Sequence, residues 1–191
     1  MIEGVILAAG FSQRAGTFKP AVLLNGKPLI RHCIDSMRPV CDRIIIVGGY
    51  AFETLRDLCV GLPDLFLVLN EHYASGMFSS VQCGLRAVKG EKFFLIPGDQ
   101  PVVKTETYRQ MLEAEGTLIV PRYQGKKGHP VLFASSHIPG ILSMPEDAIL
   151  RNYIHNQDVT ILDVDDPGIG LDVDNPHDFD KIKAYTRENT P

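Results

Sequence analysis

Short apolar runs alternate with longer amphipathic stretches along this chain, and this alternation restricts the fold more than any other feature of the sequence. Four apolar runs have the length of strands: GVILAA (4–9), RIIIVGG (43–49), LFLVLN (65–70) and FFLIPG (93–98). Four stretches have apolar residues at helical spacing: PLIRHCIDSM (28–37), FETLRDLCV (52–60), residues 77–88 and TETYRQMLEAE (105–115). Such alternation predicts a mostly parallel α/β sheet with right-handed crossovers. Continuous apolar runs also predict strands that are covered on both faces.

The pattern is looser in the second half of the chain. We expect strands over TLIVPR (117–122) and VTILDV (159–164), an edge strand over HPVLFA (129–134) and a short helix over AILRNYIH (148–155). The tail GLDVDNPHDFDKIKAY (170–185) predicts a strand, a turn at Asn175–Pro176 and a terminal helix. No linker, repeat or low-complexity segment interrupts the chain, so we expect a single domain over residues 1–191.

Composition argues against several classes of protein. The 191 residues are 45% apolar, enough for a buried core, and a net charge of −4 argues against a broad nucleic-acid-binding surface. The cysteines form no CxxC pair, which argues against a zinc knuckle or a redox dithiol. The N-terminal apolar run is too short for a signal peptide, and no run approaches the ~20 residues of a membrane span. We expect a cytoplasmic protein with reduced thiols, several of them buried, and with neither nucleic acid nor membrane as a partner.

Ligands in an open α/β sheet bind beyond the carboxyl ends of the strands, so the residues after each strand are candidates for a site. Ala8, Ala9 and Gly10 follow the first strand, and their small size lets a base or a ribose lie against the backbone. Arg14 and Lys19 then offer a planar fork and a point charge for phosphates. The stretch contains neither GxxxxGK[ST] nor GxGxxG, so it is neither of the common phosphate loops. The alternative is a surface loop with ordinary cations.

Two acidic segments are candidates for a metal site. Asp99, in PGDQP, follows a buried strand and suits Mg²⁺, which takes one or two carboxylates together with substrate phosphates and water. Asp172 and Asp174, in LDVDNP, share one face if the segment is extended, and either offers a second carboxylate. The alternatives are an Asx turn at Asp99 and compensation of the terminal helix dipole by the other two.

Two further segments carry polar side chains near predicted strand or helix ends. In ASGMFSSVQCGL, Ser75 is a candidate helix cap, and Ser79 and Ser80 lie on the first turn, where free amides favour a polar ligand. YQGKKGHPVLF places two lysines beside His129 and suits a cationic rim for an anionic second substrate. Ordinary capping and a solvated basic turn are the alternatives. His129 has no partner at metal-ligand spacing, so we do not assign it to a metal.

Taken in order, LAAGxSxRxGxxK, GMxxSxxxGL, PGDQP, GHPVLF and LDVDNPxDF resemble the MobA-like nucleotidyltransferases that attach a nucleotide to the molybdenum cofactor. The closer resemblance is to the cytidylyltransferases of that family, because the guanylyltransferases usually begin with LAGG where this chain has LAAG. The resemblance to this family extends from residue 2 to about residue 180. It implies a three-layer α/β/α Rossmann-like nucleotidyltransferase fold with a twisted sheet. It also implies Mg²⁺-dependent transfer of CMP from CTP to a molybdopterin-type cofactor. The phosphate of such an acceptor is already largely ionised near neutral pH, so we expect no general base.

The resemblance also implies roles for particular residues. It places the nucleotide pocket at Leu7, Ala8, Ala9 and Gly10, with Gly76, Ser79 and Ser80 near the nucleotide. It assigns phosphate binding to Arg14 and Lys19, catalysis to these two and Asp99, Mg²⁺ to Asp99 with Asp174 or Asp172, and the acceptor side to His129 and Pro130. A molybdenum hydroxylase or its maturation factor is the implied transient partner.

The chain departs from the family pattern at two places. Ala15 stands where the family usually has Met, and the acidic DxGAR turn after GHPVLF is reduced to Asp147 and Arg151. Three alternatives remain: the same chemistry with GTP or another phosphorylated acceptor, a non-catalytic carrier of the cofactor, and an oxidoreductase. The absence of GxGxxG argues against the oxidoreductase, and the acids and cations of the motifs argue against the carrier.

Overall fold

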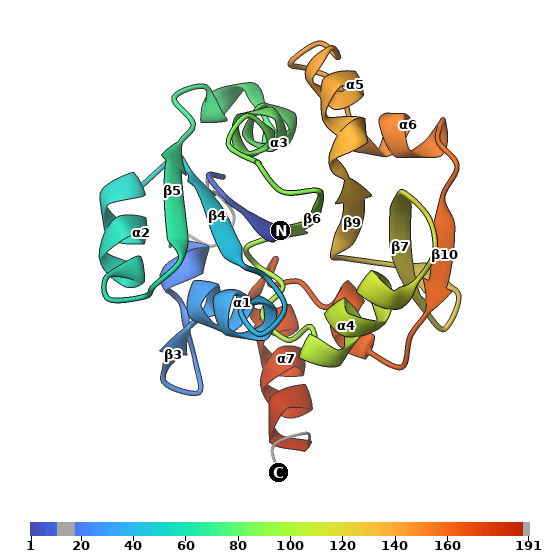
Figure 1. The fold of residues 1–191 in the computed structure, drawn as a ribbon. Helices are drawn as coiled ribbons and strands as arrows, with labels where there is room; N and C mark the ends of the chain where they lie inside the picture. The colour runs from blue at the N-terminus through green and yellow to red at the C-terminus, as the bar shows by residue number, and fades with distance from the viewer. Residues whose placement is uncertain (11–17, 189–191) are drawn as a thin grey trace.

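The computed structural model describes residues 1–10 and 18–188. Within these residues, eight strands form one sheet in the order β10-β7-β9-β6-β1-β4-β5, with β8 paired to β7 (Figure 1). The strands are β1 (Ile2–Ala8), β4 (Arg43–Gly48), β5 (Leu65–Leu69), β6 (Lys92–Pro97), β7 (Leu118–Tyr123), β8 (Lys126–Lys127), β9 (Val131–Ala134) and β10 (Thr160–Asp163). A separate two-stranded ribbon joins β2 (Leu23–Leu24) to β3 (Lys27–Pro28).

The sheet is mostly parallel, as predicted. β1 pairs in parallel with β4 and β6, β4 with β5, and β7 with β10. β9 runs antiparallel to both of its neighbours, β6 and β7. The segment HPVLFA was expected at an edge of the sheet, and this prediction was wrong. Val131, Leu132 and Phe133 are all buried between two strands, which accounts for their continuous apolar character.

β5 corrects a second prediction. Its sequence LFLVL was expected to be covered on both faces, and this cover is only partial: Leu65 and Leu67 pack against one core and Val68 against the other. Among the described residues β5 pairs with β4 alone and lies at an edge of the sheet. Phe66 and Leu69 are 47% and 45% exposed. The apolar run does not distinguish a central strand from an edge strand, since that difference depends on what packs beside it.

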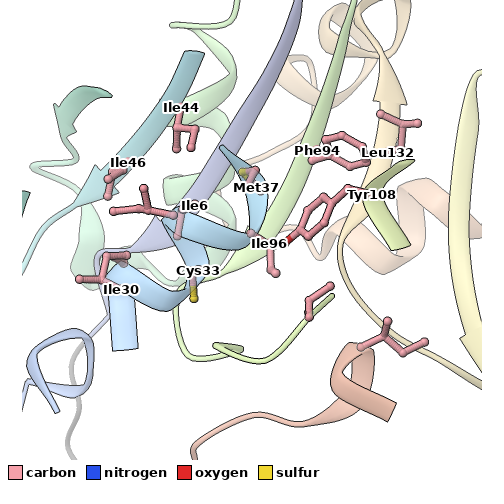
Figure 2. Close-up of a cluster of buried hydrophobic side chains, with 14 of the residues drawn as sticks. Ile6, Ile30, Cys33, Met37, Ile44, Ile46, Phe94, Ile96, Tyr108 and Leu132 are labelled. Atoms are coloured by element: carbon pink, nitrogen blue, oxygen red, sulfur yellow. The ribbon is translucent and has the colours of Figure 1, made fainter. Parts of the chain in front are cut away.

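Helices cover both faces of the sheet and make three layers (Figure 1). One face packs against α1 (Leu29–Met37), α2 (Phe52–Cys59) and α4 (Thr105–Glu113), and the other against α3 (Met77–Leu85), α5 (Ile138–Leu142) and α6 (Leu150–His155). Figure 2 shows part of the first core, where side chains of α1 meet isoleucines of β1 and β4. Tyr108 of α4 lies edge-on to Phe94 of β6, with ring centroids 5.0 Å apart. The predicted α/β fold is confirmed.

The tail differs from its prediction in one respect. Residues 171–174 form no strand and follow the short 3-10 helix η4 (Pro167–Gly170). The turn and the helix are confirmed, because Asn175 Oδ1 accepts a hydrogen bond from the Asp178 N–H (3.1 Å) at the start of α7 (Pro176–Glu188). Ile182 of α7 is buried beside Leu24 and Val173. This packing fixes the segment that carries the predicted acids.

A buried ion pair fastens the start of β1. Glu3 is 0% exposed, and its carboxylate lies 2.6 Å from the Arg43 guanidinium of β4. The second carboxylate oxygen of Glu3 accepts the N–H of Lys89 (2.6 Å), while Arg43 donates to the Ala87 carbonyl (2.6 Å). These contacts join three segments at the end of the sheet opposite the predicted site.

The four cysteines are free, and Cys33 and Cys59 are buried. In the part of the chain that the structure describes, no helix has the length and apolarity that crossing a membrane requires.

Candidate active site

A cavity of about 490 Å³ opens where β1 and β6 end. Its lining includes most of the predicted nucleotide-site residues: Leu7, Ala8, Ala9, Gly10, Lys19, Gly76, Ser80, Asp99 and Asp174. Ser79 and Asp172 are not among its lining residues. Arg14 lies outside the described residues, as does Ala15. The carboxyl ends of the parallel strands therefore bring together segments that are far apart in the sequence.

The floor of this first cavity consists of closely packed backbone. The N–H of Gly98 donates to the Leu7 carbonyl (2.8 Å), and the N–H of Tyr50 donates to the Ala9 carbonyl (3.2 Å). A Cβ atom at Gly49 would lie only 2.9 Å from the Ala9 carbonyl oxygen. Packing against the first strand therefore requires glycine at position 49, whereas a Cβ atom at Gly10 would have no atom within 4 Å among the described residues.

Lys19 joins two of the predicted metal-binding acids. Its Nζ lies 2.8 Å from Asp174 Oδ1 and 3.3 Å from Asp99 Oδ2. Lys19 begins the short 3-10 helix η1 (Lys19–Ala21), Asp99 follows β6, and Asp174 precedes α7. An ammonium group between two carboxylates shows that the site concentrates negative charge and accepts a cation.

The protonation of this triad follows from burial and pairing. Burial by itself would lower the pKa of Lys19, but the hydrogen bond and charge of Asp174 and the charge of Asp99 outweigh it and raise that pKa. Burial raises the pKa of Asp99, and the attraction of Lys19 offsets this only in part. The raised pKa of Lys19 agrees with the short distances from its Nζ to Asp174 and Asp99. A further cation near Asp99 would favour its ionised form.

The two aspartates of LDVDNP have different surroundings. Asp174 shares Lys19 with Asp99, whereas Asp172 makes no such contact among the described residues. Burial and the charge of Asp174 raise the pKa of Asp172, and the Asp172 charge acts in turn on His129. Between the two, the N–H of Val173 donates to the Asp99 carbonyl (3.0 Å), which fixes the segment against the loop after β6.

A hydrogen-bonded group at the start of α3 supports one wall of the first cavity. Asn70 Nδ2 donates to Ser79 Oγ (2.9 Å) and to Ser80 Oγ (3.0 Å), and all three residues are buried. Ser79 Oγ also donates to carbonyls, including that of Gly76 (2.8 Å). The serines therefore hold the loop that begins α3. Asn70 was missed at the level of sequence, although its place directly after a strand was a usable signal.

The predicted cap of α3 is absent. Ser75 belongs to the 3-10 helix η2 (Tyr73–Ser75), and the N-cap position is occupied by Gly76, with φ +114°. Ser75 was therefore the wrong residue for this role. Gly76 adopts a backbone conformation that other residues rarely reach, and it lines the first cavity together with Met77.

A second cavity of about 860 Å³ adjoins the first, and the two share Leu7, Met77 and Pro97. Its walls are largely apolar, and its polar lining residues are Gln100, Lys127, His129, Arg151 and His155. The predicted acceptor-side residue His129 lies in this lining, whereas Pro130 is buried and does not line the cavity. Gln100 was missed as a site residue at the level of sequence.

The charge of the second cavity is carried by lysine and arginine. Burial lowers the pKa of His129; the nearby Asp172 opposes this shift and Arg151 adds to it. His129 is therefore neutral at pH 7, and Lys127 and Arg151 supply positive charge. A largely apolar cavity with two cationic side chains suits an apolar ligand that carries an anionic group.

Comparison with known proteins agrees with this geometry. A family model described as a MobA-like NTP transferase domain matches residues 4–161. The molybdenum cofactor cytidylyltransferase of Escherichia coli (strain K12) is 29% identical over 188 residues, 97% of this chain and 97% of that protein. A probable molybdenum cofactor guanylyltransferase from Natranaerobius thermophilus is 26% identical over 158 residues, 80% of this chain and 74% of the relative.

Solved structures share the fold. The crystal structure of Rv0371c from Mycobacterium tuberculosis H37Rv has a TM-score of 0.83 and 27% identity, covering 96% of this chain and 97% of that one. A second crystal structure of Rv0371c is a complex with manganese, with a TM-score of 0.79 and 24% identity, covering 96% of this chain and 98% of that one.

Proposed function

This chain belongs to the MobA-like NTP transferase family, and we propose that it transfers CMP from CTP to the terminal phosphate of a molybdopterin-type cofactor. The products are pyrophosphate and molybdopterin cytosine dinucleotide. The observation that carries the proposal is the placement of Lys19 against Asp99 and Asp174 in a cavity that adjoins a larger, mostly apolar one. One cavity takes the nucleotide, and the other takes the acceptor.

The reaction requires positioning and charge neutralisation. An oxygen of the acceptor phosphate attacks the α-phosphorus of CTP in line. The new P–O bond forms as the bond to the bridging oxygen breaks, and pyrophosphate leaves with that electron pair. The acceptor phosphate is already ionised near neutral pH, so no side chain has to remove a proton. Lys19, and Arg14 by resemblance, hold the triphosphate and offset its charge.

The acidic residues fit a divalent metal ion, which we propose is Mg²⁺. Asp99 and Asp174 already share one cation, and two carboxylates with phosphate oxygens and water satisfy Mg²⁺. No group of three His, Cys, Asp or Glu suited to a metal occurs among the described residues, so substrate oxygens would complete the coordination. The bound ion would neutralise phosphate charge. The manganese of the Rv0371c complex is a property of that protein.

The choice of CTP rests on two supports. The LAAG segment matches the cytidylyltransferase pattern, and the Escherichia coli relative of that activity covers nearly the whole chain. The similarity to a probable guanylyltransferase favours GTP as the second candidate. In either case we propose a cytoplasmic enzyme whose product passes to a molybdenum hydroxylase or its maturation factor.

The test is direct. Purified protein is incubated with molybdopterin, Mg²⁺ and each of the four NTPs in turn, pyrophosphate release is followed, and the product is identified by mass. We expect the cytosine dinucleotide and pyrophosphate in equal amounts. Product with GTP alone would move the assignment to the second candidate. Cofactor binding without pyrophosphate from any NTP would indicate a carrier and refute the proposal.

A further inference from the structure

Gln100 is a buried polar side chain that the proposed chemistry does not use. It is 6% exposed and lies in the lining of the second cavity. Its Oε1 atom is buried and accepts no hydrogen bond within the described residues. A buried acceptor left unpaired costs folding free energy, so a fold rarely keeps one without a reason.

A second buried glutamine shows how this fold treats a structural amide. Gln82 of α3 is 2% exposed, and its Nε2 donates to the carbonyls of Met144 (2.9 Å) and Ile141 (3.3 Å). These bonds tie α3 to α5 and to the segment that follows α5. Gln100 has no comparable partner among the described residues, although it is buried to a similar extent. Packing therefore does not explain why position 100 carries an amide instead of an apolar side chain.

The backbone around Gln100 is held in place. The Cys33 thiol contacts the Gln100 carbonyl (3.4 Å) and the Gly98 carbonyl (3.6 Å) from α1. The N–H of Val173 holds the Asp99 carbonyl. Neighbouring residues on this fixed loop line different cavities, Asp99 the first and Gln100 the second. The backbone that carries the Gln100 side chain is therefore held directly beside the backbone that carries Asp99.

We propose that the Gln100 amide is a specificity residue for the acceptor, which it recognises through the hydrogen-bonding edge of a flat, amide-like heterocycle. Rotation of the Gln100 carboxamide would turn its buried Oε1 toward the second cavity, and the group would then offer a donor and an acceptor side by side, matching a ring that carries an adjacent N–H and C=O. The apolar walls suit the faces of such a ring, and Lys127 and Arg151 suit an anionic substituent on it. The inference rests on the proposed function, since it takes the second cavity as the acceptor site.

The experiment compares Gln100→Met with Gln82→Met. Methionine keeps the length and much of the volume of glutamine and removes its hydrogen bonds. For each protein, KM for molybdopterin, KM for CTP and the thermal midpoint are measured. We expect Gln100→Met to raise KM for molybdopterin at least tenfold, to leave KM for CTP within twofold, and to leave the thermal midpoint unchanged or higher. Gln82→Met is expected to lower the thermal midpoint, because two carbonyls lose their donors.

The outcomes separate this inference from the proposed function. If the wild type transfers CMP and Gln100→Met keeps the wild-type KM for molybdopterin, the role of Gln100 is refuted while the function stands. If the wild type releases no pyrophosphate, the function fails, and the role of Gln100 is then tested by quenching of the fluorescence of free pterin. Equal pterin binding by wild type and variant, or no binding by either, overturns the inference.

Discussion

Lys19 Nζ lies 2.8 Å from Asp174 Oδ1, although the two residues are 155 positions apart in the sequence. The contact joins the segment before α7 to the 3-10 helix η1, and Asp99 lies on the other side of the same ammonium group. The chain thus places a cation of its own between the two acids that we propose bind a metal ion. Two of the predictions below depend on this arrangement.

Removing the charge of Asp99 should abolish most of the activity. Asp99→Asn keeps the shape of the side chain, and we expect transfer to fall by at least about 10²-fold, the usual loss for one preorganised electrostatic contact. Turnover is measured with saturating CTP and Mg²⁺. Asp35→Asn is the control, because Asp35 pairs with Lys27 on the surface and should be silent. Normal turnover by Asp99→Asn would mean that Asp99 is a turn residue only.

Lys19 should compete with a metal ion when no nucleotide is bound. Lys19→Met leaves Asp99 and Asp174 without this shared ammonium, so Mn²⁺ should bind the nucleotide-free protein roughly tenfold more tightly, about 1.4 kcal/mol. The same variant should bind CTP more weakly, because a phosphate contact is lost. Mn²⁺ binding is followed by electron paramagnetic resonance, and Lys27→Met serves as the control. Unchanged Mn²⁺ affinity in Lys19→Met would place the metal elsewhere.

The ion pair between Glu3 and Arg43 lies at the start of β1, away from the proposed active site, and should affect stability alone. Glu3→Gln removes a fully buried charge and leaves the Arg43 guanidinium without its carboxylate partner, which should lower the free energy of unfolding by about 3 kcal/mol or more. Glu106→Gln breaks an exposed pair with Arg109 and should change it by less than about 1 kcal/mol. Urea unfolding measures both. Equal effects of the two substitutions would contradict the buried-pair argument.

The sequence predicted the order and type of most elements because apolar runs and helical spacing report burial directly. It did not predict which strand lies at an edge. β9 was expected at an edge and lies between β6 and β7, while β5 carries an equally apolar run and is half exposed at Phe66. Such placement depends on contacts between distant segments, which no local pattern records.

The site was predictable where side chains follow strands, as with Asp99 and the LAAG segment. Residues whose importance comes from the tertiary structure were missed. Asn70 gains its role from serines on a later helix, and Gln100 from a cavity formed by distant segments. The sequence also left Asp172 and Asp174 equivalent, and only the folded chain brings Asp174 to Lys19.

Lowering the pH should destabilise the protein through His137. This ring is 8% exposed and contacts the hydroxyls of Tyr153 and Thr117, each at 3.1 Å. Burial lowers its pKa below the ordinary 6.5, so the unfolded chain takes up the proton first. The stability that His137 contributes is present above about pH 6.5 and is lost as the pH falls below it. Thermal midpoints at pH 7.5 and 5.5 should differ more for wild type than for His137→Gln; an equal difference would contradict this assignment.

Nucleotide choice should depend on Ala9. In a direct competition, we expect CTP to be favoured over GTP by more than tenfold in kcat/KM, which corresponds to about 1.4 kcal/mol. Ala9 is 2% exposed and lies in the lining of the first cavity, where β1 ends. Ala9→Gly removes a methyl group, recreates the LAGG pattern and opens space for a larger base, so the preference for CTP should fall by at least threefold. Ala134→Gly, at the end of β9 and outside the lining of both cavities, controls for the added backbone freedom. An Ala9→Gly protein that keeps the full preference for CTP would show that residues outside this segment select the base. Equal use of CTP and GTP by the wild type would refute the cytidylyl assignment and leave the transferase fold intact.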